Sequence, residues 1–192
     1  MSKGLKITLI VAGVILIVGV MTFSWFRTGY DNVVAMDENV KGSWAQVENQ
    51  LKRRYDLIPN LVETVKGYAK HEKELFENIA EARTKYFNAG SVKGKVEASG
   101  QLEGFLSRLL VLRETYPELK ANENFLKLQD SLEGTENRIA VERKRYNESV
   151  QLVNTYIRTF FGRLFASFAG VSSAEYYEIP DGEKAAPKVN FQ

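Results

Sequence analysis

The chain has 192 residues, 44% of them hydrophobic and 26% charged, values that fit one folded domain with a short additional segment. It contains no cysteine and one histidine, so thiol catalysis, disulfides and metal sites with several Cys or His ligands are excluded. The net charge of +2 is unevenly spread, since residues 1–27 carry three basic and no acidic residues and leave 23 basic and 24 acidic residues for the rest. A nearly neutral body is not typical of a nucleic-acid-binding protein.

Residues 7–26 form an uncharged run of 20 residues that ends in Trp25 and Phe26. As a helix this run is about 30 Å long, which matches the hydrocarbon core of a bilayer. The run predicts a single-pass transmembrane anchor within residues 1–29, with the lipid bilayer as a partner. A cleaved signal peptide is the alternative, although no small-residue cleavage pattern precedes Tyr30. Nearly equal basic charge on both sides leaves the orientation open.

Residues 31–89 show the narrow 3.5-residue seam of long packed helices. One series repeats every seven residues through Val33, Val40, Val47, Arg54, Leu61, Tyr68 and Leu75. A second series contains Trp44, Leu51, Ile58, Val65, Glu72 and Ile79. Pro59 interrupts this helix, because proline removes one backbone donor and crowds the preceding turn. The seam keeps its phase across Pro59, so a kinked continuous helix and a corner between two helices are both open.

The segment Asn88–Ser91 predicts a helix end, and Gly94 and Gly100 predict a loose stretch after it. A shorter helix is expected at residues 101–116, closed by Pro117. A long helix should follow from about residue 121 to beyond Phe160. Together these patterns predict an all-α, elongated, antiparallel up-and-down bundle of about four helices over residues 30–171. Residues 172–192 are expected to be a mostly irregular tail, in which Val189 and Phe191 are apolar enough to dock.

Catalytic motifs are incomplete throughout the sequence. His71 and Glu72 begin like a zinc-protease motif, but Leu75 stands where the second histidine is needed. No glycine-rich phosphate loop is present, and the acidic residues resemble a solvated helix face. We therefore predict no catalytic, cofactor-binding or metal-binding residues, and expect that the protein is not an enzyme.

Charged residues also occupy positions of the apolar seams, among them Arg54, Glu136 and Arg143. A charged side chain that is buried without a partner lowers stability by several kcal/mol, roughly the loss that follows removal of one partner of a buried ion pair. An ion pair between Arg54 and Glu136 that fixes helix register is the preferred interpretation. The alternative is that the long side chains reach water.

The segment 157–171 is strongly amphipathic. Its apolar face contains Ile157, Phe160, Phe161, Leu164, Phe165 and Phe168. This face could belong to the core, to a membrane surface or to an oligomer contact, and the segment is too short and too charged to span a bilayer. A corner at Pro59 would bring it near lipid, whereas a continuous first helix would place it far from the bilayer, where it suits a partner subunit.

Several strings resemble the LemA family. They are Leu51–Val62, Val65–Tyr68 with His71 and Glu72, Tyr116–Phe125, Glu136–Ala140 with Arg143, and Tyr146, Asn147, Asn154 and Thr155. The resemblance covers about residues 30–165 and the terminal Pro187–Phe191. It implies a bacterial membrane anchor with an antiparallel four-helix-type bundle, and no established catalytic residues or cofactor. Family members tend to have Phe-Pro where this chain has Phe160-Phe161, which predicts a longer last helix here.

The sequence thus favours a membrane-anchored structural or interaction protein of the bacterial envelope. It would self-associate through its bundle or contact other envelope proteins, because anchoring raises effective concentration. The alternative is a lipid-binding or membrane-remodelling module that uses segment 157–171, with Phe160, Phe161, Leu164, Phe165 and Phe168 as the contact residues.

Overall fold

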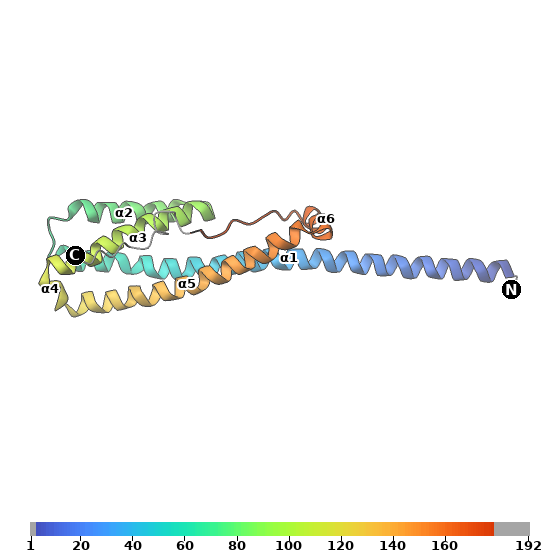
Figure 1. Cartoon of the computed structure of the whole chain (residues 1–192), viewed down its shortest axis with the longest axis horizontal. Coiled ribbons are helices and arrows are strands. Elements are labelled where there is room, and N and C mark those ends of the chain that lie inside the picture. The colour runs from blue at the N-terminus through green and yellow to red at the C-terminus, as the bar shows by residue number, and fades with distance from the viewer. Residues whose placement is uncertain (1–2, 179–192) are drawn as a thin grey trace, which may run out of the picture. The chain divides into compact units, whose positions relative to one another are not determined.

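The computed structural model describes residues 3–178, and every regular element among them is a helix. The helices are α1 (Lys3–Lys66), α2 (Lys73–Asn88), α3 (Val92–Thr115), α4 (Pro117–Lys120), α5 (Glu123–Arg158) and α6 (Phe160–Ala169) (Figure 1). No strand occurs between residues 3 and 178, which confirms the predicted all-α bundle class. The expected docking residues Val189 and Phe191 lie outside the described residues.

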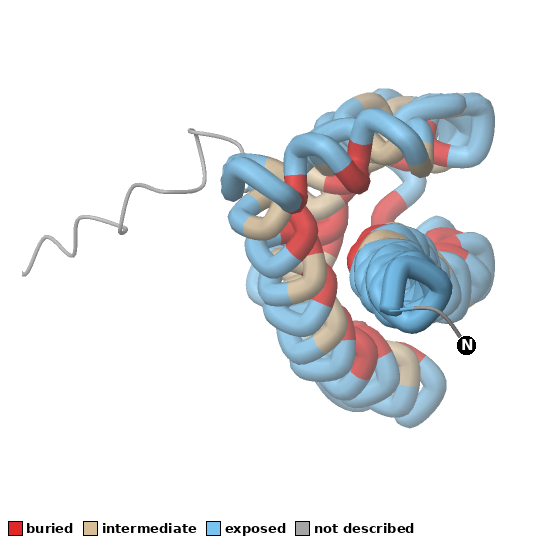
Figure 2. Tube along the Cα trace, turned by 90° about the vertical axis from the view of Figure 1, so that its right-hand side faces the viewer, coloured by how far each residue is buried: buried red, intermediate tan, exposed pale blue. Residues whose placement is uncertain are grey.

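The chain forms two compact units. The first contains the chain up to Gly42 together with Glu148–Ala174, and the second contains Ser43–Asn147 and continues from Glu175. In the second unit α2 and α3 pack against each other as a helical hairpin. Buried positions lie on the helix sides that face other helices (Figure 2). The heptad pattern of the sequence is therefore a packing pattern.

Pro59 lies inside α1 without ending it. A proline has no N–H, so the carbonyl of Tyr55, four residues earlier, loses its helical hydrogen bond. The side chain of Arg83 on α2 replaces that donor, since its Nε donates to the Tyr55 carbonyl oxygen at 3.2 Å. The helix passes Pro59 because a neighbouring helix satisfies the orphaned carbonyl.

The first break comes at Gly67, eight residues after the proline. The helix α1 ends at Lys66, and the N–H groups of Tyr68 and Ala69 both donate to the Val65 carbonyl at 2.9 Å. Glycine suits such a helix end because it lacks a Cβ. The expectation of one helix over residues 31–89 is therefore wrong, and so is a corner at Pro59. The chain reverses at residues 67–72 instead.

Helix α3 starts nine residues before the predicted residue 101. Ser91 adopts an extended conformation and its hydroxyl accepts from the Gly94 N–H at 3.1 Å, which is a standard N-cap. Val96 and Ala98 are buried in the first turns that follow. The cap and this burial outweigh the cost of the three glycines in the helix, about 1 kcal/mol each. The helix ends at Thr115, before Pro117, as predicted.

Helix α5 ends at Arg158, so the expected continuation past Phe160 is wrong. The hydroxyl of Thr159 accepts from the Gly162 N–H at 3.0 Å and starts a separate helix, α6. A Cβ at Gly162 would lie 2.0 Å from the carbonyl oxygen of Tyr156, so the tight junction requires glycine. The Thr–Gly cap ends the long helix although the proline of the family pattern is missing.

In α1 and α5 many core positions repeat at heptad spacing. Buried members are Val33, Val40, Val47, Leu51, Ile58, Leu61, Val65, Phe125, Leu132, Ile139, Tyr146, Val150 and Val153. The heptad spacing no longer predicts burial at the positions just beyond the ends of α1 and α5, because both helices end earlier than predicted. Tyr68 is 41% exposed because α1 stops at Lys66, and Phe160 is 84% exposed because it starts α6.

Candidate functional site

The buried Arg54 is the centre of a partly exposed charge network in the second unit. Its side chain is 7% exposed, and its guanidinium binds Glu103 of α3 through two hydrogen bonds of 2.8 and 2.7 Å. Its Nη1 also donates to Glu136 of α5. The structure thus brings the predicted partners Arg54 and Glu136 together and adds a second carboxylate. Three helices meet at one guanidinium, which fixes their register.

A second arginine completes the charge balance. The Nη1 of Arg143 lies 3.8 Å from Glu136, and its guanidinium stacks on the ring of Tyr177 at 4.6 Å from the centroid. Two arginines therefore face two carboxylates, Glu103 and Glu136. Tyr177 is 5% exposed and lies in the segment that follows α6. The positive and negative charges of the network are therefore equal in number, which avoids the cost of an unpaired charge shielded from water.

Buried hydroxyl groups border the network. Tyr55 on α1 donates its O–H to the hydroxyl of Ser99 on α3 at 2.8 Å. Burial raises the pKa of Tyr55 well above its usual value, and burial likewise raises the pKa of Tyr177. Burial also raises the pKa of Glu103, while Arg54 acts in the opposite direction.

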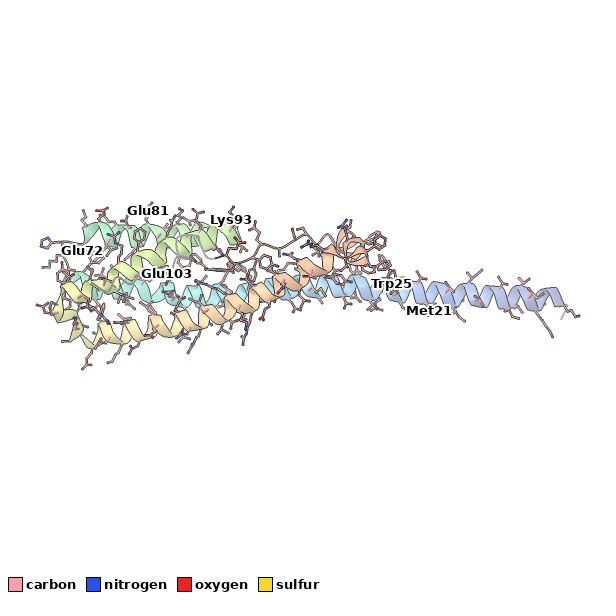
Figure 3. The ribbon with its side chains drawn as sticks, viewed as in Figure 1. Met21, Trp25, Glu72, Glu81, Lys93 and Glu103 are labelled. Carbon is pink, nitrogen blue, oxygen red and sulfur yellow. The ribbon has the colours of Figure 1, made fainter. Side chains whose placement is uncertain are left out.

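The sequence contained a signal for Glu103 that the seam analysis missed. Glu103 lies three residues before the buried Leu106 and next to the buried Leu102, so it shares the inner side of α3. Figure 3 shows Glu103 on this helix. An expected helix start at residue 101 left Glu103 in the frayed first turn. With the start at Val92, Glu103 lies well inside α3 and faces Arg54.

A shallow groove lies between α1 and α2 in the second unit. Its volume is about 270 Å³, and Ile58, Pro59, Phe76, Ile79 and Arg83 are among its lining residues. Arg83 is already engaged with the Tyr55 carbonyl, so the polar groups do not converge on the space. His71 is exposed in the turn between the two helices. Among residues 3–178, no group of three or more His, Asp or Glu side chains is placed to hold a metal.

The first unit carries a separate aromatic cluster around α6. Phe165 is 3% exposed and packs against Trp25, Phe26 and Val33 of α1. Trp25 also contacts Phe161 at 5.0 Å, and Phe26 contacts Phe168 at 5.3 Å. A Cβ at Gly29 would lie 2.2 Å from the Phe165 ring, so glycine makes room for it.

The α6 contact corrects one sequence-based expectation. A continuous helix through Pro59 was expected to place segment 157–171 far from the anchor, yet α6 contacts Trp25 and Phe26 at the end of the apolar run. The reversal at residues 67–72 explains this result, because it replaces the corner that Pro59 does not make. Of the predicted contact residues, only Phe165 is buried, while Phe160, Phe161, Leu164 and Phe168 remain 43–84% exposed.

The segment after α6 runs along α5 through reciprocal amide hydrogen bonds. In the first unit the Asn154 side chain donates to the Ala174 carbonyl and accepts from the Ala174 N–H, both at 2.9 Å. In the second unit Asn147 makes the same pair with Tyr177, at 3.0 and 2.8 Å. These two asparagines lie seven residues apart, and the side-chain amide of each bonds both the N–H and the carbonyl of one backbone residue, as a neighbouring β-strand would. Residues 171–178 are non-helical, but they are attached by specific bonds.

Residues 3–24 of α1, which precede the aromatic cluster, are all exposed. The 18-residue window richest in apolar residues is 0% buried, and α1 is the one helix among residues 3–178 that is long and apolar enough to cross a membrane. Trp25 lies beside α6, whereas Met21, one turn earlier, projects from a bare helix (Figure 3). The fold therefore defines a helical bundle built onto an apolar helix of membrane-spanning length.

Comparison with known proteins identifies this class more closely. The LemA family profile matches residues 43–191, and the chain belongs to the LemA family. It is 25% identical to magnetosome protein MamQ 2 of Paramagnetospirillum magneticum and 24% identical to magnetosome protein MamQ of Magnetospirillum gryphiswaldense, over 80% of this chain and 66% of each relative. It therefore spans slightly less than two thirds of the length of these relatives. It is also 24% identical to protein LemA of Metamycoplasma hominis, over 88% of this chain and 78% of the relative.

Proposed function

We propose that this protein is a single-pass membrane protein of the bacterial inner membrane. In this role it is a non-enzymatic scaffold that presents a helical bundle at the bilayer surface and associates with itself. The observation that carries the proposal is the continuity of α1 from the apolar run to the core. The same helix contains the exposed residues 7–24 of the apolar run and the buried positions Val33 to Leu61. A flexible linker is not needed to join span and bundle.

The polar interior of the bundle supports a structural role. Its buried charges pair with each other around Arg54, and they link α1, α3 and α5. Such a network favours one helix register over others, which is the best-documented use of buried charges. The outer surface is then available for contacts. Val111 on α3 and Val141 on α5 are 63% and 49% exposed, and they are candidates for contacts between copies.

Self-association can be tested on the full chain in detergent. The expected result is a particle mass that corresponds to a fixed number of copies, and a lower mass for Val111→Lys with Val141→Lys. A matched control is Glu118→Lys, which changes an exposed charged residue on α4. A monomeric mass at every concentration, with no crosslinked neighbour in intact cells, would count against a scaffold. Extraction from membranes by carbonate would count against the anchor itself.

A lipid-binding or membrane-remodelling role is the second candidate. It is favoured by one observation, the four large apolar side chains of α6 that α1 leaves exposed. Three of them are phenylalanines, and exposed aromatic rings on an amphipathic helix are typical of segments that enter the boundary between headgroups and acyl chains. The side of the membrane follows from a simpler measurement, the access of added protease to the bundle from outside the cell.

A further inference from the structure

Helix α6 has three distinct faces. Gly162, Phe165 and Ala166 form a buried face, in which Phe165 and Ala166 pack against Val33 of α1 and Gly162 lies against Tyr156 at the end of α5. Phe160, Phe161, Leu164 and Phe168 form a second face that is exposed, and we name it the outer aromatic face. Arg163 and Ser167 form a polar edge. At about 100° per residue these three sets fall on separate sectors of the helix. A helix that only completed the core would not need the second sector.

The outer aromatic face lies next to the end of the apolar run. Two of its members, Phe161 and Phe168, contact Trp25 and Phe26, which are the last two residues of that run. Trp25 is itself 48% exposed. The apolar surface of α1 therefore continues without interruption onto α6. Since aromatic residues at the end of a span lie at the water–lipid boundary, α6 is held at the same depth.

The charge around this face complements an anionic lipid surface. Residues 149–174 contain no Asp or Glu, and their charged residues are Arg158 and Arg163. Residues 1–30 likewise contain only basic charges, of which Arg27 follows the apolar run directly and pairs with the exposed Asp31 at 3.5 Å. Both arginines of the α6 region are exposed. Basic residues beside an amphipathic aromatic helix strengthen its binding to anionic headgroups.

We propose that α6 is an interfacial helix whose outer aromatic face is embedded in the headgroup–acyl boundary of the leaflet where α1 leaves the bilayer, with Arg158 and Arg163 at anionic phosphate headgroups. This inference rests on the proposed anchoring of residues 7–26. Lipid is favoured over a second copy of the chain as the occupant, because the face is continuous with the apolar run. The helix would limit the tilt of α1 relative to the membrane.

The absence of cysteine permits a direct depth measurement. Single cysteines at Phe160 and Leu164 report the outer aromatic face, and neither side chain makes a ring contact with α1. Ser167→Cys reports the polar edge, and Leu152→Cys on α5 is a matched control, because Leu152 is an apolar residue that is 58% exposed in the same unit. Each full-length variant is labelled with an environment-sensitive fluorophore. It is then reconstituted into vesicles of phosphatidylcholine with or without phosphatidylglycerol.

Lipids with a spin label near the headgroup should quench the labels at positions 160 and 164 several-fold more than those at 152 and 167. Removing phosphatidylglycerol, or Arg158→Gln with Arg163→Gln, should reduce this quenching, while diluting the protein in lipid should not change it. Equal, water-like signals at all four positions would overturn the proposal. Labels at positions 160 and 164 that escape quenching at high protein density, and are quenched only after dilution in lipid, would also overturn it, because they would show a second copy of the chain on this face. Quenching that does not depend on phosphatidylglycerol would overturn the assignment of anionic headgroups. Carbonate washing of the same vesicles separates these outcomes from failure of the anchor, since a chain that washes off refutes the proposed function instead.

Discussion

The Nε of Arg83 donates to the backbone carbonyl oxygen of Tyr55 across two helices, at 3.2 Å. This oxygen is the acceptor that Pro59 leaves without its helical donor. Arg83 also lies near Asp56 and stacks over Phe87, but neither of those contacts depends on the proline. The relationship makes a side chain on α2 responsible for the continuity of α1.

A thermodynamic cycle tests this relationship. Arg83→Met should lower the free energy of unfolding by about 1–2 kcal/mol in the natural chain, because a carbonyl loses its partner. In a Pro59→Ala background the alanine N–H serves that carbonyl, so the same substitution should cost about 1 kcal/mol less. Chemical denaturation of the full chain in detergent, followed by circular dichroism, measures all four variants. Arg53→Met, at an exposed position of α1, is the control and should cost the same in both backgrounds.

The sequence predicted which residues face the core better than it predicted where helices end. The heptad series identified buried positions from Val33 to Leu61 because burial repeats with the helix period. Pro59 looked like a break because its local effect is unfavourable, and the compensating donor comes from Arg83, distant in sequence. Local hydroxyl caps at Ser91 and Thr159 decided two other boundaries. Such caps are visible in a sequence only once the boundary is known.

The aromatic cluster of the first unit gives a second prediction. Gly29→Ala should weaken the docking of α6, because the new Cβ would meet the Phe165 ring at 2.2 Å and overpacking costs about 1–3 kcal/mol. The expected result is faster hydrogen exchange at the amides of residues 163–169.

Gly42→Ala provides the matched control. It lies on the same helix and its Cβ would meet nothing within 4 Å, so alanine should stabilise α1 by up to about 1 kcal/mol. Equal exchange of the α6 amides in the two variants would show that Phe165 does not depend on the glycine.

The part of the charge network that could be predicted was the pair Arg54 and Glu136, because both interrupt an apolar heptad series. Glu103 and Tyr177 could not be placed in the same way. Glu103 belongs to a helix whose start was set by Ser91, and Tyr177 is held by Asn147 in a segment without helical periodicity. Their contacts with the arginines of α1 and α5 could be identified only from the tertiary structure. The exposure of Phe160 and Phe168 also depended on the position of Gly29 opposite Phe165.

Removal of Arg54 should be the most destabilising single change in the network. Arg54→Met leaves Glu103 and Glu136 without their shared cation. Because these side chains are 30% and 39% exposed, the loss should be about 2 kcal/mol, below the cost of about 3 kcal/mol or more for a fully buried pair. Glu136→Gln should cost about 1 kcal/mol, because Arg54 retains its two bonds to Glu103. Arg54→Lys should fall between these values, since an ammonium cannot make the forked contact.

Lys52→Met is the control for the Arg54 series. Lys52 pairs with Asp56 on the exposed side of the same helix, with 64% of its side chain exposed, so its removal should cost no more than about 0.5 kcal/mol. Denaturation midpoints for Arg54→Met and Lys52→Met that coincide would contradict a structural role for the network. The Arg54→Met variant should also keep its helical content at low denaturant, which separates loss of stability from loss of the fold.

Buried tyrosines predict a loss of stability at alkaline pH. Burial raises the pKa of Tyr55, Tyr86 and Tyr177 in the folded chain, whereas in the unfolded chain each hydroxyl has its ordinary pKa of about 10. Their contribution to stability is therefore complete below about pH 10 and is lost as the pH rises from there toward the folded-state pKa. Each tyrosine that stays protonated only in the folded chain adds about 1.4 kcal/mol per pH unit to the decline of the free energy of unfolding in that range.

Tyr55→Phe should make this decline shallower by about this amount, although loss of the hydrogen bond to Ser99 lowers the stability of the variant at pH 8. Tyr176→Phe, at a 42% exposed position, is the control for removing a tyrosine hydroxyl that is not buried. Parallel curves for Tyr55→Phe and the natural chain between pH 10 and 11 would show that Tyr55 is accessible to hydroxide in the folded protein.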